Sequence, residues 1–155
     1  MKLTNKGRYA VMAMADLASN AKHGPISLSE ISLRQNISLA YLEQIFLKLK
    51  SNKLVKSSRG VNGGYVLDKP ASEIKISNII YAVDEPLDAT QCGGKQNCKD
   101  DDMCMTHELW AALSRHMVDF LDSVNLQDLV SEQRQKQAGV GAPSESKTME
   151  VLFKD

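Results

Sequence analysis

The sequence has few aromatic residues and no long run of apolar residues. Aromatic side chains make up 5% of the 155 residues, so the core must be built mainly from Leu, Ile, Val, Met and Ala. The longest uncharged apolar run, residues 10–15, is far shorter than the roughly 20 residues of a membrane-spanning helix. The N-terminus also lacks the apolar stretch and cleavage site of a secretory signal. We therefore expect no membrane association and a location in the cytoplasm.

Motifs of the common enzyme classes are absent as well. The sequence contains no Ser-His-Asp set, no phosphate-binding loop and no dinucleotide fingerprint. A nucleophile pair of Cys104 and His107 is a poor alternative, because two further cysteines lie beside it. The hydrophobic content of 43% is enough for one compact domain with an appendage. We expect a protein that is not an enzyme.

The net charge of zero conceals a basic half and an acidic half. Residues 1–69 hold eleven Lys or Arg and four acids, a balance of +7. The rest of the chain holds the other eight bases and fifteen acids, a balance of −7. Chance clustering of solvated charges is the alternative, but the division predicts that the first half meets a polyanion.

Residues 5–51 have the pattern of a helix-turn-helix unit. A first helix over residues 5–21 has an apolar stripe of Tyr9, Met12, Ala13, Leu17 and Ala18. Ser27 and Glu30 form a capping box that begins a second, short helix. After a tight turn, Ser38 is the expected N-cap of a third helix, whose core face is Leu42, Ile45, Phe46 and Leu49. The polar face of this third helix would enter the major groove of DNA.

A Gly-rich hairpin follows these helices. Residues 54–57 and 65–67 read as strands, and Arg59 lies in the turn between them. The order of three helices and a hairpin predicts a winged helix-turn-helix fold that is mainly α with a small β wing. Glu43 and Gln44 carry groups that can hydrogen-bond to base edges. Because phosphates repel its carboxylate, Glu43 would select between DNA sequences and would not add affinity. The full set of expected DNA contacts is Lys6, Arg8, Ser38, Ala40, Tyr41, Glu43, Gln44, Lys48, Arg59, Gly60, Gly63 and Gly64.

All three cysteines lie in one polar loop. Cys92, Cys98 and Cys104 are separated by five residues each, and His107 follows three positions later. A disulfide is disfavoured because the number is odd and the expected compartment is reducing. The four side chains therefore predict a metal site. Tetrahedral zinc and a 2Fe-2S cluster both remain open at this point, although zinc sites usually contain a closer pair of ligands.

A long amphipathic helix is expected after the loop. Its apolar stripe has little else in the chain to cover it, so we interpret the stripe as a dimer interface. Packing against its own winged helix is the alternative. His23 and His116 are expected at the surface, and the residues from 133 onwards are expected to form a disordered tail. The expected interface residues are Trp110, Leu113, Met117, Phe120, Leu121 and Val124.

Several of these motifs together resemble a known family. They are Leu3-Thr4 with Lys6 to Ala10, Ile37-Ser38 with Tyr41 to Gln44, Arg59-Gly60 with Gly63 to Tyr65, and the Cys and His set. The chain resembles, over about residues 1–130, the IscR family of bacterial winged-helix iron-sulfur cluster regulators. The chain departs from the family pattern at Val61-Asn62, where relatives often carry Pro-Gly. The path of the wing tip can therefore differ from that of the relatives.

The resemblance implies a homodimer with one 2Fe-2S cluster per subunit on Cys92, Cys98, Cys104 and His107. It implies that the cluster-loaded form represses cluster-assembly genes and that the cluster-free form binds a second class of DNA sites. It also implies that the cluster-assembly machinery is the cluster donor. The expected divisions are a DNA-binding domain (1–83), a cluster loop (84–106), a dimerisation helix region (107–132) and the tail (133–155). The rival hypotheses are a zinc-stapled or thiol-redox repressor and, in another class, a cluster carrier or protein-interaction module.

Overall fold

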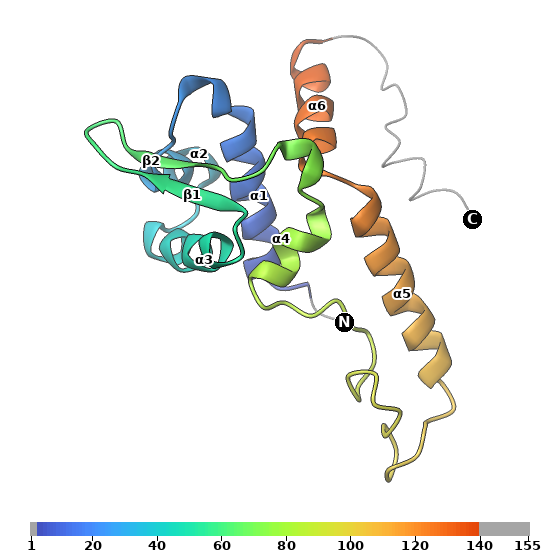
Figure 1. Ribbon diagram of the computed structural model, residues 1–155. Coiled ribbons are helices and arrows are strands. Elements are labelled where there is room, and N and C mark those ends of the chain that lie inside the picture. Colours follow the sequence, from blue (N-terminus) through green and yellow to red (C-terminus); the bar gives the residue numbers. More distant parts are fainter. Residues whose placement is uncertain (1–2, 140–155) are drawn as a thin grey trace.

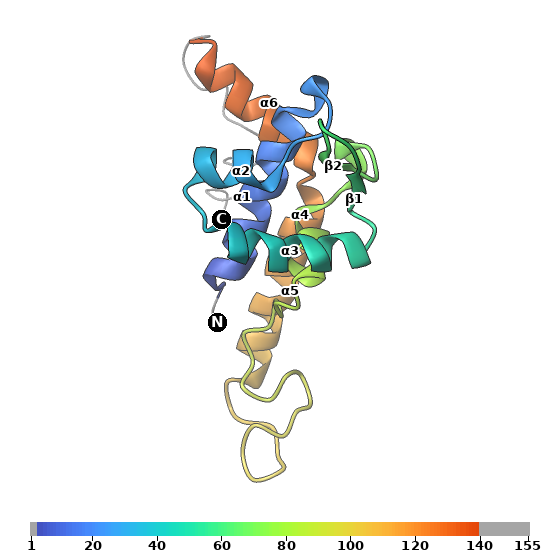
Figure 2. The same cartoon turned by 90° about the vertical axis from the view of Figure 1, so that its left-hand side faces the viewer.

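The computed structural model describes residues 3–139, which form a mainly helical body with a small hairpin (Figure 1). The first four α-helices, the hairpin and the last α-helix, which packs against the first, form the body. The loop after α4 and the start of α5 project away from it (Figure 2). Within residues 3–139 no helix is long and apolar enough to cross a membrane. The elements in chain order are α1 (Asn5–Ser19), η1 (Ala21–His23), α2 (Leu28–Gln35), α3 (Leu39–Ser51), β1 (Val55–Ser58), β2 (Gly64–Leu67), η2 (Ala71–Glu73), α4 (Ile76–Ala82), α5 (His107–Ser123) and α6 (Leu126–Gln137).

The helix-turn-helix unit begins and ends where its capping residues predict. Ser27 and Glu30 form the expected capping box at the start of α2, where the Ser27 N–H donates to Glu30 Oε2 at 2.9 Å. Asn36 ends α2 with a left-handed φ of 54°. Ser38 Oγ then accepts from the Tyr41 N–H at 3.2 Å, as predicted for the N-cap of α3. The helix-turn-helix prediction is confirmed.

The core face of α3 is as predicted, whereas the buried face of α1 is different. Leu42, Ile45, Phe46 and Leu49 are all buried. In α1, Met12 was expected in the buried stripe but is 38% exposed. The buried face includes Ala10, Ala13, Met14 and Leu17 instead. The reason is that α1 lies among α2, α3, α4 and α6, so several neighbours decide which side of it is covered.

The wing is the antiparallel pair of β1 and β2, with Val55 opposite Leu67 and Ser58 opposite Gly64. Its first strand begins one residue later than predicted. Ile26, before α2, extends the pair, because the Ile26 N–H donates to Tyr65 O and the Tyr65 N–H donates to Ile26 O. A Cβ on Gly64 would lie 2.4 Å from Ile26 O, so this contact requires glycine at position 64.

The region from 107 to 132, expected as one helical region, contains a break. Helix α5 ends at Ser123, and Asn125 is the N-cap of α6, with a capping box to Asp128. Between them Val124 is extended, and its carbonyl accepts from the Ile76 N–H at 3.0 Å. Helix α6 continues to Gln137, so residues 133–137, expected in a disordered tail, are helical. The remainder of that expected tail, residues 140–155, lies outside the described residues.

Candidate metal centre and nucleic-acid interface

Two of the three cysteines and the predicted histidine meet at the start of α5. Ligand atoms of Cys92, Cys98 and His107 all lie within 4.8 Å of one another. The Cys92 sulfur lies 3.5 Å and the Cys98 sulfur 3.7 Å from His107 Nδ1. His107, the first residue of α5, is 4% exposed, and the two cysteines are half-buried. Two side chains of the polar loop and the first side chain of α5 therefore converge on one point.

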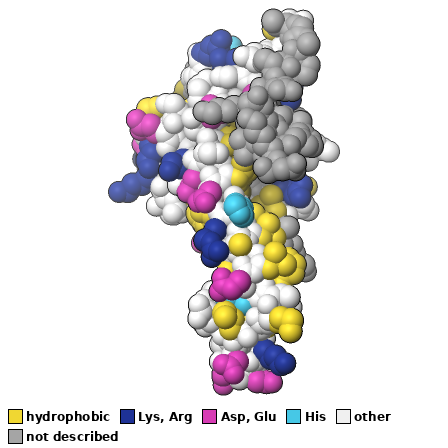
Figure 3. Space-filling model, turned by 90° about the vertical axis from the view of Figure 1, so that its right-hand side faces the viewer, with side chains coloured by type: hydrophobic (Ala, Val, Ile, Leu, Met, Phe, Trp, Pro, Cys, Tyr) yellow, Lys and Arg dark blue, Asp and Glu magenta, His cyan; other side chains and the backbone are white. Residues whose placement is uncertain are grey.

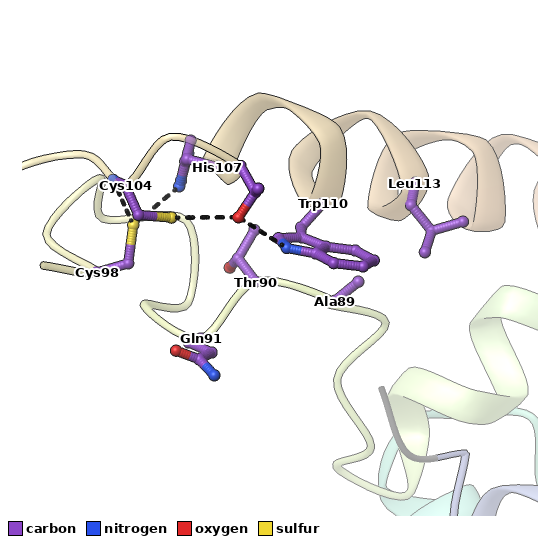
Figure 4. A pocket seen from close by; sticks show the side chains of 9 residues that line it. Ala89, Thr90, Gln91, Cys98, Cys104, His107, Trp110 and Leu113 are labelled. Atoms are coloured by element: carbon purple, nitrogen blue, oxygen red, sulfur yellow. Dashed lines mark hydrogen bonds between the residues drawn. The ribbon is translucent and has the colours of Figure 1, made fainter.

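Cys104, the other predicted ligand, lies next to this group but outside it. Its N–H donates to the Cys98 sulfur at 3.0 Å, so its backbone touches the site. Its own sulfur lies 3.8 Å from Thr106 Oγ1 (Figure 4). Thr106 in turn accepts from Trp110 Nε1 at 3.2 Å (Figure 4). The structure thus brings together Cys92, Cys98 and His107, with Cys104 adjacent.

Cys98, Cys104 and His107 border an open cavity of about 340 Å³ (Figure 4). Its walls come from the incoming limb of the loop and from the first two turns of α5. The cavity is lined by Ala89, Thr90, Gln91, Cys98, Cys104, Thr106, His107, Trp110 and Leu113. Because it opens to solvent, a bound group would be accessible from outside.

The thiols differ in their electrostatic surroundings. Burial raises the pKa of Cys92, but the backbone N–H groups of Gln96 and Gly94 outweigh this and lower its pKa to about 6. The side-chain contact with Cys104 raises the pKa of Cys98. The same contact lowers the pKa of Cys104. At neutral pH the loop therefore presents at least one thiolate, which is the form that binds metals.

A small polar network that no sequence motif predicts holds the loop against α5. Asp88 Oδ1 accepts from the Thr90 N–H at 2.8 Å, and the Ala89 N–H donates to Ser114 Oγ at 2.8 Å. Ser114 Oγ also donates to Asp88 Oδ1 at 3.3 Å. The hydrogen bonds from Thr90 lower the pKa of Asp88. The only signal in the sequence was a short Asp and Thr pair before the first cysteine.

The donor set suits a soft metal or an iron-sulfur cluster. Thiolate sulfur and imidazole nitrogen are ligands of zinc and of iron-sulfur centres, whereas Mg²⁺ and Ca²⁺ take oxygen ligands. His107 is buried with its Nδ1 facing two sulfurs, so its orientation is already that of a ligand. The residues present therefore fit the group that the sequence predicts.

The outward face of α3 carries the residues that were expected to read DNA. Ala40, Glu43 and Gln44 are exposed there, together with Leu47, which is 64% exposed. Tyr41 is half-buried, and its ring meets the edge of Tyr9 at a centroid distance of 5.8 Å. Its ring thus packs on α1 as well as bordering this face. Figure 2 shows α3 lying across the surface of the body.

Positive charges lie on the two neighbours of α3, helix α1 and the wing. Arg8 is exposed on α1, and Arg59 is exposed in the wing turn. Lys48 Nζ lies 2.5 Å from Asp84 Oδ2, so this expected phosphate contact is paired with a carboxylate at the end of α4. The wing glycines Gly60, Gly63 and Gly64 lie at or beside the turn, and Gly60 has a φ of 117°.

The residues of the expected dimer interface fall into two groups. Trp110 is 40% exposed, and Leu113 and Met117 are half-buried. Apolar side chains gather over α5 on the face that Figure 3 shows. Phe120 and Leu121 pack against the core of their own chain, and Val124 is 6% exposed within it. Val124 was expected in the dimer interface, but it packs in the core of its own chain, which was the alternative.

Comparisons with known proteins identify the family of the chain. Residues 3–132 match the family described as "Rrf2: Iron-dependent Transcriptional regulator". The chain is 53% identical over 133 residues to the HTH-type transcriptional regulator IscR of Photorhabdus laumondii, which covers 86% of this chain and 81% of the relative. The identity to IscR of Escherichia coli O1:K1 is also 53%, over 86% of this chain and 82% of the relative.

Two solved structures share the fold over most of the chain. The structure of T. potens IscR is 32% identical with a TM-score of 0.72, and the match covers 92% of this chain and 93% of that one. CymR, the global cysteine regulator of B. subtilis, is 35% identical with a TM-score of 0.74, over 84% of this chain and 97% of that one. Because two regulators with different names share this fold, the fold alone leaves the signal undetermined.

Proposed function

This chain belongs to the Rrf2 family of iron-dependent transcriptional regulators, and on that premise we propose that it senses an iron-sulfur cluster and binds promoter DNA as a homodimer. The family consists of DNA-binding regulators and not of enzymes. The observation that carries the proposal is the convergence of two cysteine sulfurs on the buried Nδ1 of His107. A regulator of transcription works at the chromosome, so we place the chain in the cytoplasm.

The bound group is proposed to be one 2Fe-2S cluster per subunit, held by Cys92, Cys98, Cys104 and His107. Such a cluster would supply a centre that changes oxidation state and can be lost. Cys104 would join the other ligands by turning its sulfur away from Thr106. His107 is a neutral ligand that protonation can remove, which suits a labile site better than a permanent one. The expected donor of the cluster is the cluster-assembly machinery.

DNA recognition is assigned to α1, α3 and the wing. The exposed Glu43 and Gln44 would face base edges, whereas Lys6, Arg8 and Lys48 would hold phosphates. Arg59 would enter the minor groove beside the wing. In line with IscR regulators, the cluster-loaded form would repress cluster-assembly genes, and the cluster-free form would bind a second class of sites. Glu43 would distinguish the two classes of DNA site, because its carboxylate fits only sequences whose base edges can donate a hydrogen bond to it.

Dimerisation is assigned to the exposed part of α5. Trp110, Leu113 and Met117 leave apolar surface uncovered on a helix that projects from the body. Two copies would place two α3 helices against successive major grooves. In this arrangement residues 1–83 read DNA, residues 84–106 together with His107 hold the cluster, and α5 joins the subunits.

A second candidate is a thiol-redox repressor without a cluster. The lowered pKa of Cys92 favours it, because a thiolate is also the form that oxidants attack. The similarity to a cysteine regulator is compatible with it. A zinc-stapled repressor and a cluster carrier are the remaining alternatives.

Anaerobic purification of the full chain tests these alternatives. We expect a coloured protein with two irons and two acid-labile sulfides per chain, as a 2Fe-2S centre requires. Cys92→Ala should lose the colour but stay folded, whereas His116→Ala, which removes an exposed histidine of α5, should keep it. A colourless protein with one zinc supports the zinc repressor, and a metal-free protein supports the thiol repressor.

DNA binding by the loaded and cluster-free forms completes the test. Affinities for a set of promoter fragments should differ between the two forms at one or more sites. A protein that binds its cluster but no promoter fragment would be a carrier or a protein-interaction module. Equal affinities at every site would reduce the chain to a plain repressor.

A further inference from the structure

Glu85 is a buried carboxylate that neither the metal site nor the DNA surface uses. It lies three residues beyond α4, where the chain leaves for the cysteine loop, and is 4% exposed. Its N–H donates to Ile80 O at 3.3 Å, which holds this residue on the end of α4. Burial of a carboxylate is costly unless hydrogen bonds compensate for it. The position therefore requires a specific explanation.

The carboxylate supplies the missing cap of α1. Thr4, the N-cap residue, makes no side-chain capping bond. Instead its N–H donates to Glu85 Oε1 at 2.5 Å, across 81 positions of the chain. A negative charge at a helix N-terminus satisfies a free N–H group and is favoured by the helix dipole. The segment that begins the metal loop thus holds the start of α1.

Gly7 makes this contact possible. A Cβ at position 7 would lie 1.9 Å from Glu85 Oε2, a distance that no side chain tolerates. Glycine is a poor helix former in a helix interior, yet it occupies the first turn of α1 here. Oε2 has no hydrogen-bond partner in the part of the chain that the structure describes. Gly7 and Glu85 therefore form one matched pair.

The neighbouring residue joins the same turn to the recognition helix. Asp84 has a left-handed φ of 59°, and its carboxylate accepts from Lys48 of α3. Asn52 Nδ2, at the end of α3, also donates to Ala82 O at 3.3 Å. The turn at residues 82–85 therefore contacts both helices that carry proposed DNA contacts, seven positions before Cys92.

We propose that Glu85 is a positioning residue that couples the metal-site loop to the DNA-reading helices by capping α1 against Gly7. This inference rests on the proposed function. When the loop changes its path with the state of the metal site, the turn that carries Glu85 changes how firmly α1 is held. Lys6 and Arg8 of α1 then shift relative to α3, which alters the fit to DNA.

Variants of the full chain test the coupling through a ratio of affinities. The ratio compares cluster-loaded with cluster-free protein on one promoter fragment. Glu85→Ala should bring this affinity ratio closer to one by a factor of about five or more, which is the lower end of the usual range for a coupling between sites. Iron and sulfide per chain should stay as in the unaltered protein. Glu73→Ala, which removes an exposed carboxylate from η2, is the matched control and should change nothing.

Gly7→Ala provides an independent route to the same change. It displaces the Glu85 carboxylate without altering that residue, so it should also move the ratio toward one. In thermal unfolding of cluster-free protein it should destabilise the chain. In the Glu85→Ala background it should instead stabilise the chain, because the clash with the carboxylate is gone and alanine favours the helix. The other close neighbour of such a Cβ, Leu3 Cδ1 at 3.1 Å, belongs to an exposed side chain that can move aside. Glu85→Gln keeps an acceptor for Thr4 and should retain more of the ratio than Glu85→Ala.

The outcomes separate this inference from the proposed function. If the unaltered protein has a ratio of one at every site, the proposed function fails and the coupling fails with it. If the unaltered protein responds to its cluster and Glu85→Ala responds equally, the proposed function stands and the coupling role is wrong. An equal effect of Gly7→Ala on stability in both backgrounds would also overturn the pairing.

Discussion

Arg34 donates two hydrogen bonds to Asp16, from Nε at 2.9 Å and from Nη2 at 2.7 Å, and so joins α2 to α1. The Asp16 side chain is 2% exposed, and Gln35 Nε2 donates to the same carboxylate at 2.8 Å. A bidentate pair of this kind fixes direction as well as distance. It therefore sets the angle at which the first helix supports the helix-turn-helix unit.

Removal of Arg34 should destabilise the fold. Arg34→Ala leaves the buried Asp16 carboxylate with Gln35 and Asn20 as remaining partners. We expect a loss of about 2 kcal/mol, less than for a fully buried pair because Arg34 is partly exposed. Urea unfolding of cluster-free protein measures it, with the exposed Arg115→Ala as control. Equal midpoints for the two variants would contradict a structural role for the pair.

Cys92 should be more reactive than Cys98 in the cluster-free, reduced protein at neutral pH. Its pKa of about 6 lies below pH 7, so the thiolate predominates there, whereas the raised pKa of Cys98 keeps that thiol protonated. Lowering the pH to 5 protonates Cys92 and should slow its alkylation by roughly tenfold. Mass spectrometry after brief iodoacetamide treatment locates the label. Labelling of Cys98 before Cys92 would refute this ordering.

Arg59 should contribute to the salt dependence of DNA binding. Arg59→Ala removes an exposed positive charge from the wing turn and should weaken binding. The slope of log K against log salt should become shallower by up to about one unit, as expected when one positive charge is lost from beside the DNA backbone. Lys136→Ala, on the far helix α6, serves as the charge-matched control. An unchanged slope would remove Arg59 from the DNA contacts.

Glu43 should limit which sequences α3 accepts. Glu43→Ala removes a carboxylate from the exposed face of α3, and phosphate repulsion is lost with it. We expect tighter binding to non-cognate fragments and a loss of discrimination of about 1 kcal/mol or more between sites. Competition binding against a panel of single-base operator variants measures both effects. Unchanged discrimination would show that Glu43 faces solvent in the complex.

The two groups of apolar residues near the end of the chain should behave differently. Met117→Glu places a charge on the half-buried face of α5 and should convert a dimer to monomers with little change in subunit folding. Val124→Ala removes core contacts and should cost about 2 kcal/mol of stability without changing the oligomeric state. Sedimentation and urea unfolding separate the two effects. A Met117→Glu protein that stays dimeric would place the interface elsewhere.

The sequence allowed good predictions wherever neighbours in the chain decide the structure. The capping box of Ser27 and Glu30 and the N-cap at Ser38 are interactions over three residues, and both are confirmed. The buried face of α3 follows its helical period in the same way. By contrast Met12 was placed on the wrong side of α1, because four surrounding helices decide which face of α1 is covered. The extended Val124 likewise follows from its pairing with the distant Ile76.

The metal site shows the same division. The presence of three cysteines and His107 in one short loop was evident from spacing, and the chemistry of thiolate and imidazole followed from residue type. That Cys92 and Cys98 meet His107 while Cys104 turns to Thr106 could not be predicted, because loop dihedrals and hydrogen bonds decide side-chain direction. The contact between Glu85 and Thr4 spans 81 positions and leaves no periodic signal.

The amino-acid sequence by itself therefore determined the helix-turn-helix unit, the wing and the ligand types, since each depends on interactions between residues a few positions apart. The tertiary structure alone decided which face of α1 is buried, where the last helices break, and that a glutamate at the root of the metal loop caps the first helix against Gly7. Those features depend on groups that folding brings together from distant positions, and their free energies exist only once the packed core is formed.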